Sequence, residues 1–395
     1  MVCRDLRAYR RQNTLKVLSV NATLDPVAGG GTAERTFQLS RHLALAGVEC
    51  SVLTLDLGLQ PERITDLRPS TVTALHCTVP RYFLFSLPEP RVRQLVHNAD
   101  IVHLMGHWTL LNALVYREAR RQAKPYVVCP AGALPIYGRS RRLKNAYNLL
   151  AGRPCMQNAD ACVAVARNEM VHFAAYGVDP KRVTLIPNGV DPAEFASVDD
   201  AGFRRKFGLS DAPFILFLGR LDPIKGPDLL LDAFAKAAPG IADVQIVFAG
   251  PDGGMRGTLE SSAQHYGVAE RTHFIGPIRG ADKSHACHAA CLLAIPSRQE
   301  AMSIVVLEAG ICGTPVLITD QCGFNELAAS GGGMVVPASA AGLEGGLREM
   351  LDIQSRLPGM GARLRDFTRE HYLWEKIVGR YLQLFSQLGQ QGKSR

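Results

Sequence analysis

The sequence lacks any apolar run that approaches the roughly 20 residues needed to span a bilayer. None of its ten cysteines lie in C-x-x-C pairs, and most sit in apolar stretches, where a reduced thiol behaves as a small hydrophobe. The basic start, residues 1–13, precedes a segment too polar and too short for the core of a signal peptide. These absences argue against a secreted or membrane-spanning protein and predict a cytoplasmic one.

The length and composition predict more than one domain. At 395 residues the chain exceeds the size at which a single core usually stops growing, so two domains of roughly 180 to 200 residues are expected. With 47% apolar and 20% charged residues, the composition is that of an ordinary soluble globular protein.

Charge is distributed unevenly along the chain. Residues 1–150 hold 20 Lys plus Arg against 10 Asp plus Glu, whereas the rest holds 24 against 26. The first half is therefore expected to face an anionic membrane surface or a phosphate-bearing acceptor, although a merely solvated basic face is the alternative. Nucleic acid is not an expected partner, because aromatic and basic residues are not interleaved as a stacking platform requires.

Short β-branched runs alternate with amphipathic helical stretches, which predicts an α/β fold with parallel sheets covered by helices. Helices are expected at residues 32–46, with Gly47 as the stop signal, and at 374–388. The predicted strands are residues 16–21, 49–55, 101–104, 126–129, 161–166 and 183–187 in the first half, and 214–218, 245–249, 273–275, 292–295 and 316–318 in the second.

A segment rich in Asp, Pro and Gly, which follows the turn signal Asn188-Gly189, breaks this rhythm and is interpreted as a hinge. Two doubly wound domains facing each other would bind a ligand at the carboxyl ends of their strands. The predicted organisation is a basic extension 1–13, a Rossmann-like domain 14–190, a linker 191–212, a second Rossmann-like domain 213–372, and a terminal helix 373–395 that packs back toward the first domain.

Arg220 and Lys225 follow the predicted strand 214–218, where an open α/β sheet presents its ligand-binding loops. Arg can hold a phosphate in a forked pair of hydrogen bonds, and Lys can add a point charge, so the two suit a leaving diphosphate. Gly219 and the nearby Gly226 shape this loop. The alternative is a surface loop with two solvated cations.

Glu300 and Glu308 stand eight residues apart in E-A-M-S-I-V-V-L-E. Ser303 is a candidate N-cap for a helix over 304–312, and Gly313 is its stop, so the positive end of the helix would point at the same ligand. The two carboxylates would accept hydrogen bonds from sugar and ribose hydroxyls, respectively. The alternative is that both glutamates are ordinary surface residues.

Gly30 and Gly31 open the helix that follows the first strand, and such a loop lets backbone approach a phosphate or a sugar closely. A dinucleotide fingerprint is not expected, because Glu34 occupies its third glycine position.

His103 and His107, in D-I-V-H-L-M-G-H-W, would point to one side if the strand continued, and either could bond a sugar or acceptor hydroxyl. A structural histidine is the alternative for both.

The cluster H-A-C-H-A-A-C, residues 285–291, could suggest zinc. Its histidines and cysteines fall only partly on one helical face, so it is interpreted as an ordinary helix, and no metal site is predicted.

Nearly the whole chain resembles the retaining glycosyltransferases of family 4, which have the GT-B architecture of two Rossmann-like domains. The resemblance rests on G-G-G-T-A-E-R-T-F, D-I-V-H, I-P-N-G-V-D, G-R-L-D-P-I-K-G, the E-x7-E pair and G-T-P-V. It implies that the domain 14–190 binds the acceptor and the domain 213–372 binds the nucleotide-sugar. It further implies that Arg220 and Lys225 bind the donor diphosphate, that Glu300 contacts the donor sugar, and that Glu308 contacts the ribose. The donor-binding set that follows from it is Gly30, Gly31, Gly219, Met302, Ser303, Ile304 and Glu308.

Many family members read D-x-x-H-x-H-G, whereas this chain has Met105 at the second histidine, so His107 takes over that contact or the contact is absent.

The resemblance implies metal-independent transfer of a hexosyl group from a UDP- or GDP-sugar, with no cofactor, to a glycan or lipid-linked acceptor in bacterial cell-surface polysaccharide synthesis. A nucleotide-sugar epimerase and a non-catalytic sugar-nucleotide-binding protein are the alternatives. An acceptor at the inner face of the cell membrane would explain the basic first half.

Overall fold

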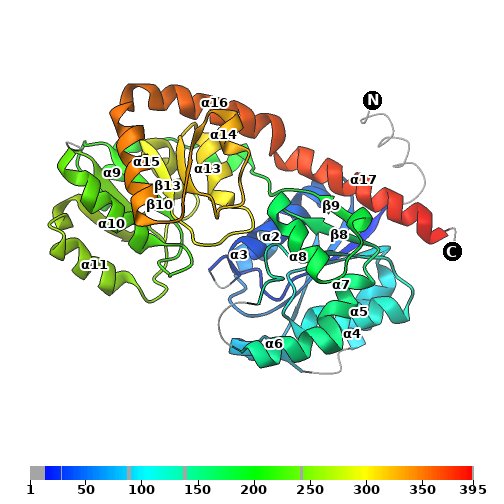
Figure 1. Ribbon diagram of the computed structural model, residues 1–395. Coiled ribbons are helices and arrows are strands. Elements are labelled where there is room, and N and C mark those ends of the chain that lie inside the picture. The colour runs from blue at the N-terminus through cyan, green and yellow to red at the C-terminus, as the bar shows by residue number, and fades with distance from the viewer. Residues whose placement is uncertain (1–13, 28, 87–89, 137–139, 241–242, 394–395) are drawn as a thin grey trace. The chain divides into compact units, whose positions relative to one another are not determined.

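The computed structural model describes residues 14–27, 29–86, 90–136, 140–240 and 243–393. The predicted extension 1–13 lies outside them. The chain forms two compact units (Figure 1). Unit 1 contains Met1–Asn188 and Trp374–Arg395, and unit 2 contains Gly189–Leu373.

Unit 1 is built on a seven-stranded sheet in which every neighbouring pair is parallel. The strand order is β3-β2-β1-β6-β7-β8-β9. Its strands are β1 (Lys16–Val20), β2 (Glu49–Leu55), β3 (Thr71–Leu75), β6 (Ile101–Met105), β7 (Tyr126–Cys129), β8 (Ala161–Ala164) and β9 (Val183–Leu185). The main helices are α2 (Gly30–Leu45), α4 (Pro90–Asn98), α5 (Leu110–Arg121), α6 (Arg141–Tyr147), α7 (Arg153–Gln157), α8 (Met170–Ala175) and α17 (Trp374–Lys393).

The central strands of unit 1 are apolar runs because both faces of the sheet are covered. All five residues of β6 and all four of β7 are buried. The strand order reverses beside β1, whose neighbours are β2 and β6, so the loops after β1 and β6 diverge at a topological switch point.

A fully buried arginine joins three segments of unit 1. Arg35 of α2 donates to the carbonyl oxygens of Ile186 (2.8 Å) and Pro187 (2.8 Å), to Asn188 Oδ1 (2.7 Å) and to the Tyr381 hydroxyl (2.9 Å). These bonds tie α2 to the stretch after β9 and to α17. The desolvated guanidinium is stabilised there because both of its terminal NH2 groups find acceptors, whereas Nε has no partner among the described residues.

Unit 2 is built on a six-stranded parallel sheet in the order β12-β11-β10-β13-β14-β15. Helices α10, α11 and α15 pack together, and α9, α12, α13 and α16 form a second packed group. Two groups are expected because the strand order runs in both directions from β10, and right-handed crossovers then place helices on both faces of the sheet. The strands are β10 (Phe214–Leu218), β11 (Gln245–Ala249), β12 (Thr272–Gly276), β13 (Leu292–Ile295), β14 (Val316–Thr319) and β15 (Gly333–Val336). The helices are α9 (Asp200–Phe207), α10 (Pro227–Ala237), α11 (Arg256–His265), α12 (Ala281–Ala289), α13 (Ile304–Cys312), α15 (Ala340–Asp352) and α16 (Leu357–His371).

The fold confirms the predicted α/β class with two parallel sheets. Each predicted strand is present within two residues at either end, and the helix predicted over 304–312 is α13 with those bounds. The strands β3 and β15, at the edges of the two sheets, were not predicted. No helix in the described ranges combines the length and the apolar character needed to cross a bilayer.

Candidate functional site

The predicted donor-binding residues of unit 2 lie around the switch point of its sheet. The strand order reverses beside β10, whose two neighbours are β11 and β13. The loop 219–226 follows β10, and the segment 296–303 follows β13, so both leave the same edge of the sheet side by side. In open α/β sheets this is the position at which ligands bind.

Two glycines let the loops at this edge approach one another closely. Gly226 has a φ of +68°, and a Cβ there would lie 2.2 Å from the Pro296 carbonyl oxygen. At Gly250, after β11, a Cβ would lie 1.9 Å from the Gly219 carbonyl oxygen. Only glycine fits these contacts, so the loop that carries Arg220 and Lys225 is fixed by backbone packing on both sides.

The Lys225 ammonium forms an ion pair with the Glu300 carboxylate, and the distance from Nζ to Oε1 is 2.9 Å. The Glu300 side chain is 10% exposed and the Lys225 side chain 35%. Ser297 Oγ also donates to the carboxylate, and the Glu300 N–H donates to the Gln321 carbonyl oxygen at 2.8 Å. The structure therefore brings together one predicted cation and one predicted acid, with the acid held from two sides.

Glu308 forms a second ion pair, with a lysine that the sequence analysis missed. Lys283 Nζ of α12 lies 2.7 Å from Glu308 Oε1 of α13, and the Lys283 ammonium also lies 5.1 Å from the centre of the Phe195 ring. Glu308 is buried rather than a solvated surface residue. No spacing in the sequence relates Lys283 to Glu308, because the contact depends on how α12 packs on α13.

Helix α13 presents its N-terminus beside these pairs. Ser303 is the N-cap residue, as predicted, but its hydroxyl makes no capping hydrogen bond to the helix. The first turn, which begins at Ile304, contains no acidic residue. Met302 is buried, and Gly323, with a φ of +65°, supports this segment so closely that a Cβ would meet the Ala301 carbonyl oxygen. This helix end can therefore accept an anion.

Arg220 is half-buried in the same loop, and Gly253 flanks its stem, since a Cβ at Gly253 would lie 3.1 Å from Arg220 Cγ. Unit 2 thus has Arg220 and the Lys225–Glu300 pair on the loops after β10 and β13, and the Lys283–Glu308 pair on α12 and α13 near the N-terminus of α13. Such a set can bind a ligand that carries both phosphate and hydroxyl groups.

In unit 1, Gly30 and Gly31 form the first turn of α2, directly after the N-cap Gly29. Gly30 has a φ of +54°, and the first turn carries no acidic residue. A Cβ at Gly29 would lie 2.7 Å from Ala33 Cβ and 2.8 Å from Thr23 Cγ2, so the loop is tightly packed there. The glycines begin the helix at the switch point beside β1.

The expectation that residues 103, 105 and 107 share one face of a continuing strand is wrong. Strand β6 ends at Met105, and Gly106 turns the chain with a φ of +76°. His107 is buried on the following loop, where Nε2 lies 2.9 Å from Asn148 Oδ1. Burial lowers the pKa of His107 to about 4, although the bond to Asn148 opposes this shift, so the ring is neutral near pH 7.

His103 lies in the core of unit 1, packed edge-on against Tyr381 at 5.4 Å and Phe385 at 6.4 Å between ring centres. Neither ring nitrogen has a hydrogen-bond partner among the residues that the structure describes. Burial, with a smaller contribution from Arg35, lowers the pKa of His103 to about 3. A role for His103 at the site remains a prediction, and its surroundings are those of a core residue under α17.

The histidines and cysteines of α12 have other partners. His285 Nε2 lies 2.8 Å from Ser197 Oγ, His288 Nε2 lies 3.0 Å from the Phe195 carbonyl oxygen, and Cys287 is buried. Within the described ranges, no group of three or more His, Cys, Asp or Glu side chains is placed to hold a metal ion.

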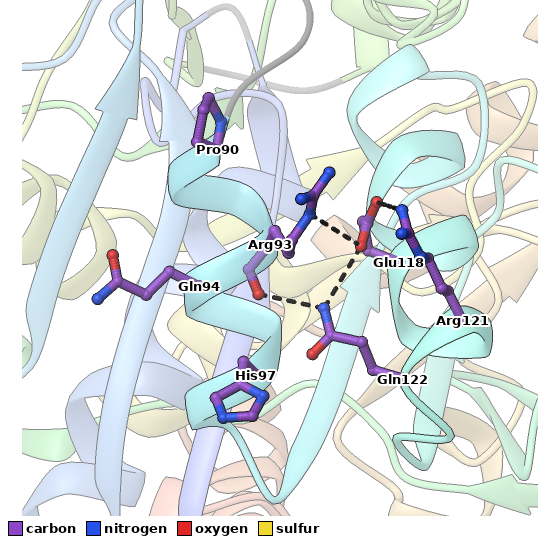
Figure 2. Close-up of a pocket in the computed structure, with 7 residues that line it drawn as sticks. All are labelled: Pro90, Arg93, Gln94, His97, Glu118, Arg121 and Gln122. Atoms are coloured by element: carbon purple, nitrogen blue, oxygen red, sulfur yellow. Dashed lines mark hydrogen bonds and ion pairs between the residues drawn. The ribbon is translucent and has the colours of Figure 1, made fainter.

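A hollow of about 400 Å³ between α4 and α5 lies apart from these residues (Figure 2). Its polar groups already pair with one another, since Glu118 lies 3.9 Å from both Arg93 and Arg121, and Gln122 donates to the Arg93 carbonyl oxygen. The charges of Glu118, Arg93 and Arg121 are therefore already compensated, although Gln122 Oε1 has no partner among the described residues. It is lined by Pro90, Arg93, Gln94, His97, Glu118, Arg121 and Gln122.

Two family descriptions match the chain. Residues 30–189 match the Glycosyl transferase 4-like domain, and residues 199–369 match Glycosyl transferases group 1. Among curated proteins, the D-inositol 3-phosphate glycosyltransferase of Geodermatophilus obscurus is 27% identical over 93% of this chain and 87% of that protein. The protein of the same name from Stackebrandtia nassauensis is 34% identical over 59% of this chain and 55% of its own length.

Solved structures share the fold across both units. Anabaena Alr3699/HepE in complex with UDP-glucose has a TM-score of 0.77 at 18% identity, covering 94% of this chain and 100% of that one. The sucrose-phosphate synthase of Thermosynechococcus elongatus has a TM-score of 0.73 at 20% identity, covering 95% and 99%. A putative UDP-N-acetylglucosamine 2-epimerase from Listeria monocytogenes has a TM-score of 0.61 at 17% identity, covering 94% and 95%.

Proposed function

Because the chain belongs to the group 1 glycosyltransferases, we propose that it moves a hexosyl group from a UDP- or GDP-sugar to a hydroxyl of a glycan or lipid-linked acceptor, with retention of anomeric configuration. The observation that carries the proposal is the pair of lysine–glutamate contacts beside the N-terminus of α13. The HepE structure, which contains UDP-glucose, supports the donor class.

The Lys225–Glu300 pair keeps both groups neutralised before the donor arrives. When a nucleotide-sugar binds, diphosphate oxygens replace the carboxylate at Lys225, and sugar hydroxyls donate to Glu300 in place of the ammonium. Arg220 adds a forked contact to the diphosphate. Glu308, held by Lys283 through one carboxylate oxygen, offers the other to the ribose hydroxyls.

In the transfer step, the bond from the anomeric carbon to the diphosphate oxygen breaks, and a bond from that carbon to the acceptor oxygen forms on the same face. The departing phosphate oxygen takes the proton of the acceptor hydroxyl. Arg220, Lys225 and the N-terminus of α13 stabilise the negative charge that develops on the leaving group, so the reaction needs no divalent ion.

The acceptor side is proposed for unit 1, with His107 and the Gly30-Gly31 turn as contacts. The excess of basic residues in 1–150 suits a phosphate-bearing or lipid-linked acceptor at the inner face of a bacterial membrane, as in polysaccharide synthesis. The names of the curated relatives make D-inositol 3-phosphate a further acceptor to test.

The test has two stages. A thermal-shift screen with UDP, GDP and their sugars is expected to raise the melting temperature with one nucleotide family, because a ligand of the native state stabilises it. The stabilising donor is then incubated with glycan, lipid-linked and inositol-phosphate acceptors, with and without a chelator. Transfer that survives the chelator supports the proposal.

Three other outcomes would contradict parts of this proposal. A donor recovered with an inverted ring centre would indicate an epimerase, which the fold of the Listeria protein makes the second candidate. Binding without transfer or hydrolysis across the acceptor panel would indicate a non-catalytic binding protein. Activity that a chelator abolishes and only a divalent ion restores would overturn the metal-independent mechanism.

A further inference from the structure

The most exposed large apolar side chains in the described part of the chain lie next to each other on one helix of unit 1. Leu149 is 78% exposed and Leu150 80%, and Leu143 on the same helix is 59% exposed. They belong to a helical stretch, residues 141–157, formed by α6, a turn of π-helix at Asn148–Gly152, and α7. Scattered single leucines need no explanation, but three on one helix face form an apolar patch.

The inner side of this helix is already occupied. Tyr147 donates its hydroxyl to the His107 carbonyl oxygen at 2.6 Å, and Asn148 donates to the Tyr176 hydroxyl at 2.8 Å. The Lys144 ammonium lies 5.3 Å from the centre of the Trp108 ring. Because Tyr147, Asn148 and Lys144 contact the rest of unit 1, the exposed leucines lie on the opposite, outer side of the helix. Figure 1 shows α6 at the periphery of unit 1.

The charge of the helix identifies the kind of partner. Residues 141–157, R-R-L-K-N-A-Y-N-L-L-A-G-R-P-C-M-Q, contain four basic residues and no Asp or Glu. Arg141 and Arg142 are exposed at its beginning, and Arg153 is exposed near its end. A second copy of this face would bring these arginines against one another, whereas an anionic surface would attract them.

We propose that the outer face of this helix, formed by Leu143, Leu149 and Leu150 with Arg141 and Arg142, docks on the surface of an anionic phospholipid bilayer. The leucines enter the boundary between headgroups and acyl chains, and the long arginine side chains reach the lipid phosphates. The bilayer then lies on the side of unit 1 that carries His107, which suits an acceptor held on lipid. This inference rests on the membrane contact in the proposed function, and it assigns that contact to named residues.

Flotation of the full-length protein tests the proposal. One set of vesicles contains equal parts of phosphatidylglycerol and phosphatidylcholine, and the other contains phosphatidylcholine alone. We expect the wild type to float with the anionic vesicles at low salt and to remain behind with the neutral ones. The double variant Arg141→Gln, Arg142→Gln is expected to lower the bound-to-free ratio by about 25-fold, from roughly fivefold per arginine. The variant Leu149→Gln, Leu150→Gln is expected to lower it by about tenfold.

Matched controls remove the same chemistry elsewhere in unit 1. The variant Leu45→Gln, Val171→Gln deletes two apolar side chains that are each 67% exposed, and Arg117→Gln, Arg121→Gln deletes two exposed arginines of α5. Both are expected to float like the wild type. The nucleotide-dependent rise in melting temperature, measured on every variant, shows whether the protein is folded and binds its donor.

The inference is overturned if the helix variants float as well as the wild type, if the control variants lose as much binding, or if the wild type floats with neither vesicle. It is equally overturned if sedimentation velocity shows a wild-type dimer that Leu149→Gln, Leu150→Gln dissociates, because the patch would then bind a second copy. None of these results touches the transferase proposal, whose readout is transfer from the donor to a soluble acceptor.

Discussion

At the scale of single residues, the two ion pairs of unit 2 differ from the surface pairs around them. Exposed pairs such as Lys206–Asp282 contribute little to stability, since water screens both charges. Glu300 and Glu308 are each only 10% exposed as side chains, so their lysines compensate carboxylates that have largely left water. Loss of either lysine therefore affects both folding and binding.

Lys225→Met is expected to reduce kcat by about 100-fold or more, because it removes one cation from the charge that develops on the leaving diphosphate. Steady-state transfer with the stabilising donor measures this effect. Lys206→Met, which breaks an exposed lysine–aspartate pair of the same unit, is the control and should retain wild-type turnover. Equal kcat values for wild type and Lys225→Met would remove Lys225 from the mechanism.

Lys283→Met is expected to lower the stability of the protein by about 2 kcal/mol, because the buried Glu308 carboxylate loses its partner. If Glu308 orients the ribose, KM for the donor rises more than kcat falls. Thermal denaturation and donor titration measure the two effects, and Lys236→Met, from the exposed Lys236–Asp232 pair, is the control. Destabilisation with an unchanged KM would leave Lys283 a purely structural residue.

His103 predicts how stability depends on pH. Its folded-state pKa of about 3 lies below the ordinary value of 6.5, so the unfolded chain binds a proton that the folded core excludes. This stabilisation is fully present above pH 6.5 and is lost as the pH falls from 6.5 toward 3, by up to about 1.4 kcal/mol per pH unit.

His103→Phe removes this titration without removing a hydrogen bond, because neither ring nitrogen has a partner in the described part of the chain. Both tryptophans, Trp108 and Trp374, belong to unit 1, so urea unfolding followed by tryptophan fluorescence reports on that unit. Between pH 6 and 4.5 the variant should lose stability less steeply than the wild type. Identical slopes would show that His103 titrates normally in the folded protein.

At the scale of elements, the sequence predicted the bounds of those strands and helices that apolar runs, turn residues and helix caps determine locally. The central strands are continuous apolar runs bounded by turn residues, and α13 has Ser303 before it and Gly313 after it, so their bounds could be read directly. The edge strand β3 is only half-buried, and β15 begins at Gly333 within a glycine run, so neither gives that signal. Packing between elements, such as Lys283 against Glu308, leaves no trace in local spacing.

The contact between the loops after β10 and β13 yields a prediction about a single methyl group. Gly226→Ala adds a Cβ that would lie 2.2 Å from the Pro296 carbonyl oxygen, at a φ of +68°. The loops must separate, and nucleotide affinity is expected to fall by about tenfold or more. Isothermal titration with the stabilising nucleotide measures it.

Gly257→Ala is the control, because that residue lies within α11 with open space around it. Alanine there should leave affinity unchanged and raise helix stability slightly. Unchanged affinity in Gly226→Ala would show that the nucleotide does not depend on how these two loops pack.

At the scale of the whole molecule, alternating strands and helices were enough to predict two parallel sheets, because a helical crossover between two strands lets them pair in parallel. The placement of His107 could not be predicted. The strand that carries His103 stops at Met105, and the turn at Gly106 moves the second histidine toward Asn148 of a distant helical stretch. Such a contact depends on how α6 and the π-helical turn at Asn148–Gly152 pack against the loop after β6, and residue spacing alone does not encode that packing.

Unit 1 is built from two separate stretches of the sequence, one before and one after unit 2, and this affects the order in which the protein can fold during synthesis. Residues up to 188 emerge from the ribosome first, yet α17 is translated only after the whole of unit 2. Until then the nascent chain has no Tyr381 hydroxyl to accept from Arg35, and His103 lacks the aromatic rings that cover it. Unit 1 therefore begins to be synthesised first but can complete its core only when translation ends, and the surface that α17 covers stays exposed until then.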